Sequence, residues 1–121
     1  MPEEEEISPQ IRNQLMQFDQ LRQQAQMISM QRQQTEMKME ENKVAVEALE
    51  AAGDGAPVYR NVGALMIQTD KKSALDRIKE ENETLEIRAK VLKTQEEKAM
   101  ERLTALQAQI QAALKNVPGA Q

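Results

Sequence analysis

The chain has 121 residues, about the length of one domain, with a formal net charge of −4 and 30% charged residues. Phe18 and Tyr59 are its only aromatic residues, which disfavours a globular core and favours an elongated helical protein. The absence of Cys and His excludes disulfides and thiolate metal sites and removes the commonest general base. No basic stripe indicates nucleic-acid binding, and no apolar run approaches the roughly 20 residues that span a bilayer.

The chain begins with an acidic leader, residues 1–7, which is the reverse of the positive start of a signal peptide. We therefore expect a soluble protein of a reducing compartment, the cytoplasm.

A long helix is predicted over residues 8–51, because Ser8 and Pro9 form the preferred pair of N-cap and first helical residue. Two Gly and a Pro in AAGDGAP (Ala51–Pro57) mark its end.

A second long helix is predicted over residues 71–115, which contain no Gly or Pro, with Thr69 or Asp70 as its cap. Residues 52–70 form the linker, and residues 116–121 form a tail. Both helices keep a seven-residue apolar repeat, which predicts a left-handed coiled coil. Its core positions in the first helix are Ile11, Gln14, Phe18, Leu21, Ala25, Ile28, Arg32, Thr35, Met39, Asn42, Val46 and Leu49. In the second helix they are Leu75, Ile78, Asn82, Leu85, Ala89, Leu92, Glu96, Ala99, Leu103, Leu106, Ile110 and Ala113.

The linker is long enough for the two helices to pair within one chain as an antiparallel hairpin. Aligning Leu49 with Leu75 places Asn42 opposite Asn82, so that two polar core residues share a layer and fix the register. The same register brings Arg32 and Glu96 into adjacent layers, where they can form an ion pair. The alternative is a parallel homodimer in which these polar positions coincide by chance.

The stretch VYRNVGALMIQTD, from Val58 to Asp70, departs from the helical pattern. Its β-formers, with Asn61 and Gly63 as turn residues, predict a β-hairpin. A two-stranded hairpin is marginal alone, so we expect its open edges to pair with other subunits. The alternative is a small cap folded back on its own helices. The predicted oligomerisation residues are Val58, Tyr59, Val62, Leu65, Met66 and Ile67.

No pattern of catalytic, metal-binding or cofactor-binding residues stands out, and the carboxylates fit solvated helix faces at i,i+4 spacing. We therefore expect neither an enzyme nor a cofactor or metal site. Five Met residues of the first helix are more suggestive, because Met is common on adaptable binding surfaces. They either pack beside the seam or form a surface for varied apolar partners. These residues are Met16, Met27, Met30, Met37 and Met39.

Apolar residues also gather at the helix ends far from the hairpin, and some lie outside the core positions. Exposed apolar side chains of this kind mark interaction sites. The predicted site comprises Ile7, Ile11, Leu15, Phe18, Leu106, Ile110, Leu114 and Val117.

From about Ile11 to Ile110 the chain resembles prefoldin, in particular its β-class subunit. The most specific part is VYRNVGALMIQTD followed by DRIKEENETLEIRAKVLKTQEEK (Asp76–Lys98). The linker has room for one β-hairpin, whereas an α-class subunit is expected to have two.

The resemblance implies a mostly α fold, in which a long antiparallel coiled coil carries a β-hairpin that joins an intersubunit barrel. It implies a hexamer of two α-class and four β-class subunits. This chaperone would hold unfolded polypeptide at its coiled-coil ends without ATP and pass it to a group II chaperonin. The apolar end residues would then bind the client. The alternative from the sequence is a tethering coiled coil without client activity.

Overall fold

The first helix begins at a side-chain cap. In the computed structural model, which describes residues 8–116, helix α2 runs over Pro9–Ala51. The backbone N–H of Ile11 donates to Ser8 Oγ at 3.1 Å, so Ser8 satisfies one of the free donors of the first turn. Pro9 takes the first helical position, where its missing N–H costs nothing.

The second helix, α3, runs over Lys71–Lys115 and is capped by Asp70. The Ser73 N–H donates to Asp70 Oδ1 at 2.7 Å, and the Ser73 hydroxyl donates to Asp70 Oδ2 at 2.9 Å. Of the two predicted caps, Asp70 is therefore the one used. Helix α2 has no basic residue in its last turn, and Lys71 supplies the missing cation from the start of α3.

Between the helices lie two antiparallel strands, β1 (Val58–Val62) and β2 (Leu65–Thr69). Val62 pairs with Leu65, so the turn consists of Gly63 and Ala64 alone. Gly63 has a φ of +59°, and no other described residue has a positive φ, which is the pattern of a type II′ turn. Assigning Asn61 to the turn was wrong, because it lies within β1 opposite Met66.

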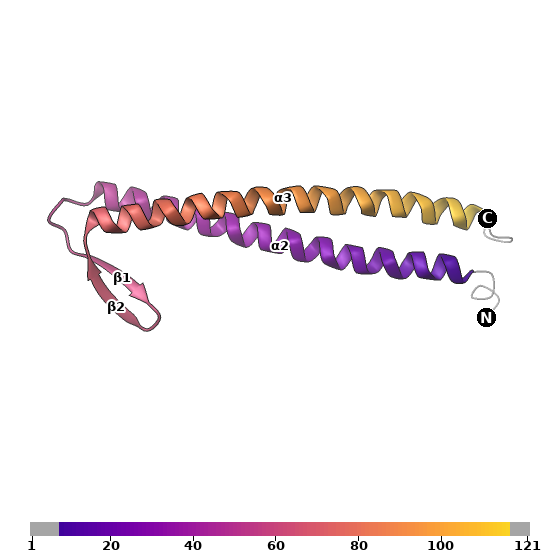
Figure 1. The fold of residues 1–121 in the computed structure, drawn as a ribbon, viewed down its shortest axis with the longest axis horizontal. Coiled ribbons are helices and arrows are strands. Elements are labelled where there is room, and N and C mark those ends of the chain that lie inside the picture. The colour runs from indigo at the N-terminus through magenta and orange to yellow at the C-terminus, as the bar shows by residue number, and fades with distance from the viewer. Residues whose placement is uncertain (1–7, 117–121) are drawn as a thin grey trace. The chain divides into compact units, whose positions relative to one another are not determined.

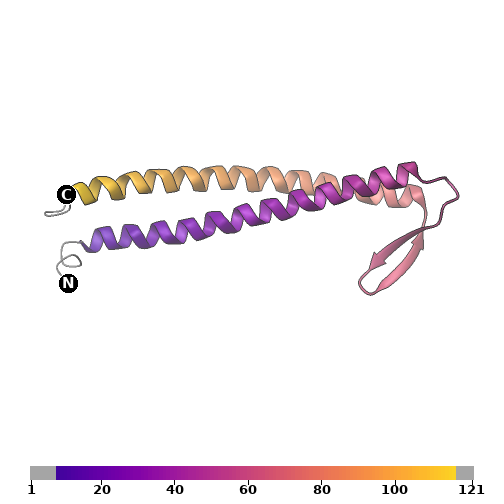
Figure 2. The same cartoon turned by 180° about the vertical axis from the view of Figure 1, so that it is seen from behind.

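The chain divides into two compact units, residues 32–91 and residues 1–31 with 92–121. Within each unit a segment of α2 lies beside an antiparallel segment of α3 (Figures 1 and 2), and the hairpin belongs to the first of these units. All the predicted core positions are buried or half-buried. The helical hairpin with a β-hairpin between its helices is confirmed as the fold.

Candidate assembly and client-binding surfaces

The seam of residues 32–91 contains a polar layer. Asn42 is only 5% exposed, and its Nδ2 donates to Asn82 Oδ1 at 2.9 Å. The structure thus brings together the two Asn residues that the sequence places opposite each other. Beside this layer, Lys38 Nζ lies 3.9 Å from Glu81 Oε1 across the helix pair. Exposed pairs of this kind contribute about 0–1 kcal/mol, so the buried amide pair is the stronger determinant of register.

The predicted ion pair between Arg32 and Glu96 stays a prediction. Arg32 Nη1 lies 2.9 Å from Glu36 Oε2, one turn along the same helix. This contact is an i,i+4 pair of the kind that supports single helices.

The β-hairpin exposes most of its apolar surface in the single chain. The Met66 side chain is 70% exposed, and Leu65 and Tyr59 are more than half exposed. Cross-strand pairing places Val62 and Ile67 on the same face as Leu65, and Tyr59 and Met66 on the other. Val58, at the base of the hairpin, is half-buried. Apolar residues so exposed on two open strand edges form a surface suited to pairing with another chain.

Two consecutive residues join the hairpin to both helix ends. The Lys71 ammonium donates to the Ala52 carbonyl at 3.0 Å and to the Glu50 carbonyl at 3.5 Å, and it lies 3.6 Å from Asp54 Oδ1. A cation at this point satisfies free carbonyls and complements the helix dipole. Its neighbour Asp70 caps α3, and the backbone N–H of Ser73, followed by its hydroxyl, lowers the pKa of the Asp70 carboxyl.

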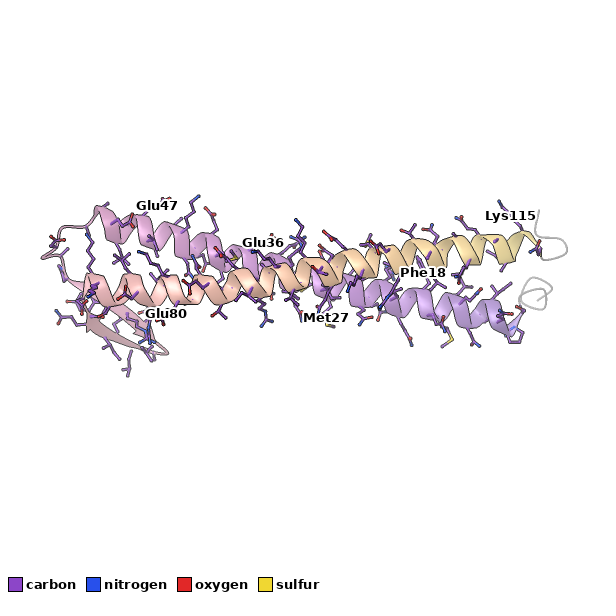
Figure 3. All side chains as sticks on the ribbon, turned by 45° about the horizontal axis from the view of Figure 1, so that its top comes forward. Phe18, Met27, Glu36, Glu47, Glu80 and Lys115 are labelled. Atoms are coloured by element: carbon purple, nitrogen blue, oxygen red, sulfur yellow. The ribbon has the colours of Figure 1, made fainter. Side chains whose placement is uncertain are left out.

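In the unit of residues 1–31 and 92–121, the core forms around Ala25, Ala99 and Leu103. Phe18, Leu21 and Ile28 pack against it, and Figure 3 labels Phe18 on α2. The predicted client-binding residues divide by burial. Ile11 and Ile110 are 5% and 6% exposed, so they close the seam in the single chain. Phe18, Leu106 and Leu114 are half-buried, whereas Leu15 is 42% exposed. Ile7 and Val117 lie outside the described residues.

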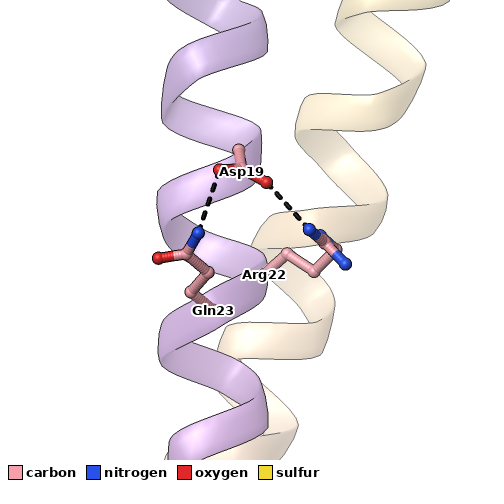
Figure 4. Close-up of polar contacts among 3 residues, drawn as sticks. All are labelled: Asp19, Arg22 and Gln23. Atoms are coloured by element: carbon pink, nitrogen blue, oxygen red, sulfur yellow. Dashed lines mark hydrogen bonds and ion pairs between the residues drawn. The ribbon is translucent and has the colours of Figure 1, made fainter.

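The outer surface of this unit is polar but carries little unpaired charge along α2. Asp19 accepts hydrogen bonds from Arg22 at 2.9 Å and from Gln23 at 3.1 Å (Figure 4), so its carboxylate neutralises the guanidinium on the same helix.

Met16, Met27 and Met30 are each more than half exposed. This exposure favours a partner surface over packing beside the seam for these three Met side chains.

Between residues 8 and 116 no three acidic side chains are placed to hold a metal ion. Neither helix, within the same residues, has a stretch long and apolar enough to cross a membrane.

Three functional candidates were missed in the sequence: Lys71, Arg60 and Arg77. The signal for Lys71 was present, because α2 ends without a basic residue and Lys71 is the first residue after the Asp70 cap. Arg60 and Arg77 line one groove beside the hairpin. No local pattern could have joined them, because they come from elements distant in sequence that meet only at the base of the hairpin.

These features define a class of protein, a two-helix coiled coil that carries an open β-hairpin between its helices. The family model described as "Prefoldin subunit" matches residues 12–116. The chain is 45% identical over 109 residues to prefoldin subunit beta of Methanosarcina acetivorans, covering 90% of this chain and 93% of the relative. It is 39% identical over 113 residues to prefoldin subunit beta of Thermococcus onnurineus, covering 93% of this chain and 97% of the relative.

The solved structures agree with the sequence relatives. The crystal structure of the prefoldin beta subunit from Thermococcus strain KS-1 superposes with a TM-score of 0.78 at 40% identity, covering 88% of this chain and 94% of that chain. The beta2 subunit from the same strain, at 24% identity, shares the fold with a TM-score of 0.70 and covers 75% of this chain and 97% of its own. The chain belongs to the prefoldin family, and its relatives named here are beta subunits. That family comprises chaperone subunits and is not a family of enzymes.

Proposed function

We propose that the chain is a cytoplasmic β-class subunit of a hexamer with two α-class and four β-class subunits. In this assembly it holds unfolded polypeptides at the ends of α2 and α3 that lie far from the hairpin in the sequence. It acts without ATP or any other cofactor, catalyses no reaction, and passes its clients to a group II chaperonin. The competing function is a tethering coiled coil that binds no client.

The observation that carries the holdase proposal is the exposure of Leu15. It is 42% exposed and lies outside the seam, within one helical turn of the half-buried Phe18. Leu106 and Leu114, also half-buried, lie on the α3 segment of the same unit. An unfolded client exposes scattered apolar segments, so several weak apolar contacts on separate subunits suit it better than one rigid pocket.

The seam at this end contains a weak point that supports transient opening. The Gln14 side-chain oxygen is buried and has no hydrogen-bond partner among residues 8–116. An unsatisfied buried polar atom costs about 1–3 kcal/mol, and water satisfies it when the helices separate. Separation would also release Ile11 and Ile110, which the closed seam buries. Gln14 therefore lowers the cost of presenting these two side chains to a client.

The test removes residues 1–14 and 111–121 together from the full assembly. These segments contribute only the last seam layers, so the complex should still assemble while suppression of aggregation of a denatured client falls sharply. Suppression equal to that of the full chain would refute a role in client holding for the removed residues, among them Ile11 and Leu114. Dissociation of the truncated complex would show that the ends are structural and would favour the tethering function.

A pair of point variants separates this site from apolar surface in general. Leu15→Gln with Leu114→Gln removes two apolar side chains from the proposed site. The matched control, Ile87→Gln with Val91→Gln, removes two side chains that are at least half exposed on α3 within residues 32–91. Only the first pair should reduce client holding. A separate variant, Gln14→Leu, should strengthen the closed seam and reduce holding without changing assembly.

The proposed partners need separate measurements. Native mass spectrometry of this chain with an α-class subunit tests the hexamer and its stoichiometry. Transfer is tested by adding a group II chaperonin with ATP to the complex of client and hexamer. Refolding should then exceed that obtained when the chaperonin is added to the client after dilution without the hexamer.

A further inference from the structure

A groove of about 510 Å³ lies within residues 32–91, between the base of the hairpin and the adjoining helix segments. The apolar part of its lining combines small side chains, which leave space, with aliphatic ones. The small side chains are those of Ala45, Ala48 and Ala74, and the aliphatic ones are those of Leu49, Val58 and Ile78. Such a surface fits an aliphatic side chain from outside.

Two guanidinium groups also line this groove, Arg60 from β1 and Arg77 from α3. Neither forms an ion pair with any residue between 8 and 116, and no carboxylate of these residues lines the groove. Arg60 is the only charged residue in the two strands, and its cross-strand partner is Ile67. The groove therefore presents positive charge in a chain whose net charge is −4. Guanidinium groups beside an apolar surface suit bidentate recognition of a carboxylate.

We infer that this groove receives a segment of a neighbouring subunit of the prefoldin complex, one that carries a carboxylate beside an aliphatic side chain. The aliphatic side chain occupies the space above Ala48 and Ile78, while Arg60 and Arg77 bind the carboxylate. The inference rests on the proposed assembly through the hairpin. It adds the chemistry of the contact that would hold a neighbour at the hairpin's base.

The position of the groove identifies the occupant as a subunit and not a client. Val58 and Arg60 line the groove and share a strand face with Val62, Leu65 and Ile67, three of the apolar residues proposed for assembly. Tyr59, another of them, also lines the groove, from the other strand face. A neighbour that covers this face therefore extends directly to the two guanidinium groups. Charge complementarity then selects an acidic segment and positions it against the apolar lining.

The test uses the full chain co-expressed with an α-class prefoldin subunit. Arg60→Glu combined with Arg77→Glu should weaken assembly by at least about tenfold, the effect of losing one good charge pair, and should lessen the salt dependence of assembly. Arg88→Glu combined with Lys90→Glu is the matched control, because it makes the same change in net charge at two exposed α3 residues of the same unit that do not line the groove. Circular dichroism should show both variants to be as helical as the parent chain.

Ile67→Asp separates this inference from the general role of the hairpin. If Ile67→Asp dissociates the complex and the double Arg variant assembles normally, the groove inference is wrong and hairpin assembly stands. If neither variant dissociates, both are wrong. An equal loss in the variant with Arg88→Glu and Lys90→Glu would also overturn the inference, because the effect would then come from net charge.

A photo-crosslinking amino acid at position 48 identifies the occupant directly. The expected product joins the groove to a neighbouring subunit near an Asp or Glu, as read by mass spectrometry. A product with a denatured client alone, or no product in the assembled complex, would refute the assignment.

Discussion

Replacing the two Asn residues of the seam one at a time should have unequal effects. Asn42 is 5% exposed, whereas Asn82 is half-buried. In Asn82→Leu the Asn42 amide loses its 2.9 Å partner and stays enclosed in the seam. In Asn42→Leu the remaining Asn82 amide can still reach water. We therefore expect Asn82→Leu to be the more damaging change.

The magnitudes follow from this difference in burial. Losing the hydrogen bond costs about 1 kcal/mol, and enclosing an unsatisfied amide raises the cost to about 1–3 kcal/mol. A Leu at position 42 recovers about 1.5–3 kcal/mol by burial, and a Leu at the half-buried position 82 recovers less. Asn82→Leu should thus destabilise the chain by about 1 kcal/mol, while Asn42→Leu should be near neutral. The double Leu variant leaves no unsatisfied amide and should be more stable than the parent.

Urea unfolding of the full chain, followed by circular dichroism, measures these free energies. Asn13→Leu is the control, because it makes the same change at an exposed position of α2 and should alter the free energy of unfolding by less than about 0.5 kcal/mol. The double Leu variant should gain free energy of unfolding, but its two helices should pair in a less specific register. A Cys pair replacing Met39 and Leu85, which the register places opposite each other, should form an intrachain disulfide less completely in the double Leu background.

Two results would refute this reasoning. One is an Asn82→Leu variant no less stable than Asn42→Leu. The other is additivity of the two changes, because residues that share a hydrogen bond should show a coupling free energy of about 0.5–3 kcal/mol.

Other changes test the hairpin and its junction with the helices. Ile67→Asp places a charge in the proposed intersubunit β-structure, so light scattering should show loss of the oligomer while circular dichroism shows the helices retained; an intact oligomer would contradict the assembly role. Lys71→Met removes the donors to the Ala52 carbonyl and should lower the free energy of unfolding by about 1 kcal/mol, whereas Lys71→Arg should restore it; equal stability of all three would disprove the cap. Asp70→Asn tests the lowered pKa of Asp70. Because the folded pKa lies below the unfolded value of about 3.9, the carboxylate stabilises the fold above that pH and loses this effect as the pH falls through the folded pKa. The parent should therefore exceed Asp70→Asn in melting temperature at pH 7 and match it near pH 2; a difference independent of pH would contradict the assignment.

The sequence by itself determined the helices, their start signals and the seam. Caps and heptads are local patterns, so Ser8, Asp70 and the core positions could be recognised without coordinates. The pairing of Asn42 with Asn82 followed as well, because two regular helices joined by a short linker have few registers that bury both core stripes. The β-hairpin was evident from its composition, but its turn was misplaced. Asn61 and Gly63 are both turn formers, and only strand pairing and the positive φ of Gly63 locate the turn.

Tertiary structure alone decided the features that depend on the angle between elements. Lys71 reaches the carbonyls of Glu50 and Ala52 because the linker returns the chain to the end of α2. Arg60 and Arg77 share one groove because the linker brings the base of the hairpin beside the start of α3. The seam closes over Ile11 and Ile110 but leaves Leu15 exposed, a distinction that apolar composition cannot make. Periodicity specifies which face of a helix is buried, whereas contacts between elements distant in sequence depend on how the linker directs them.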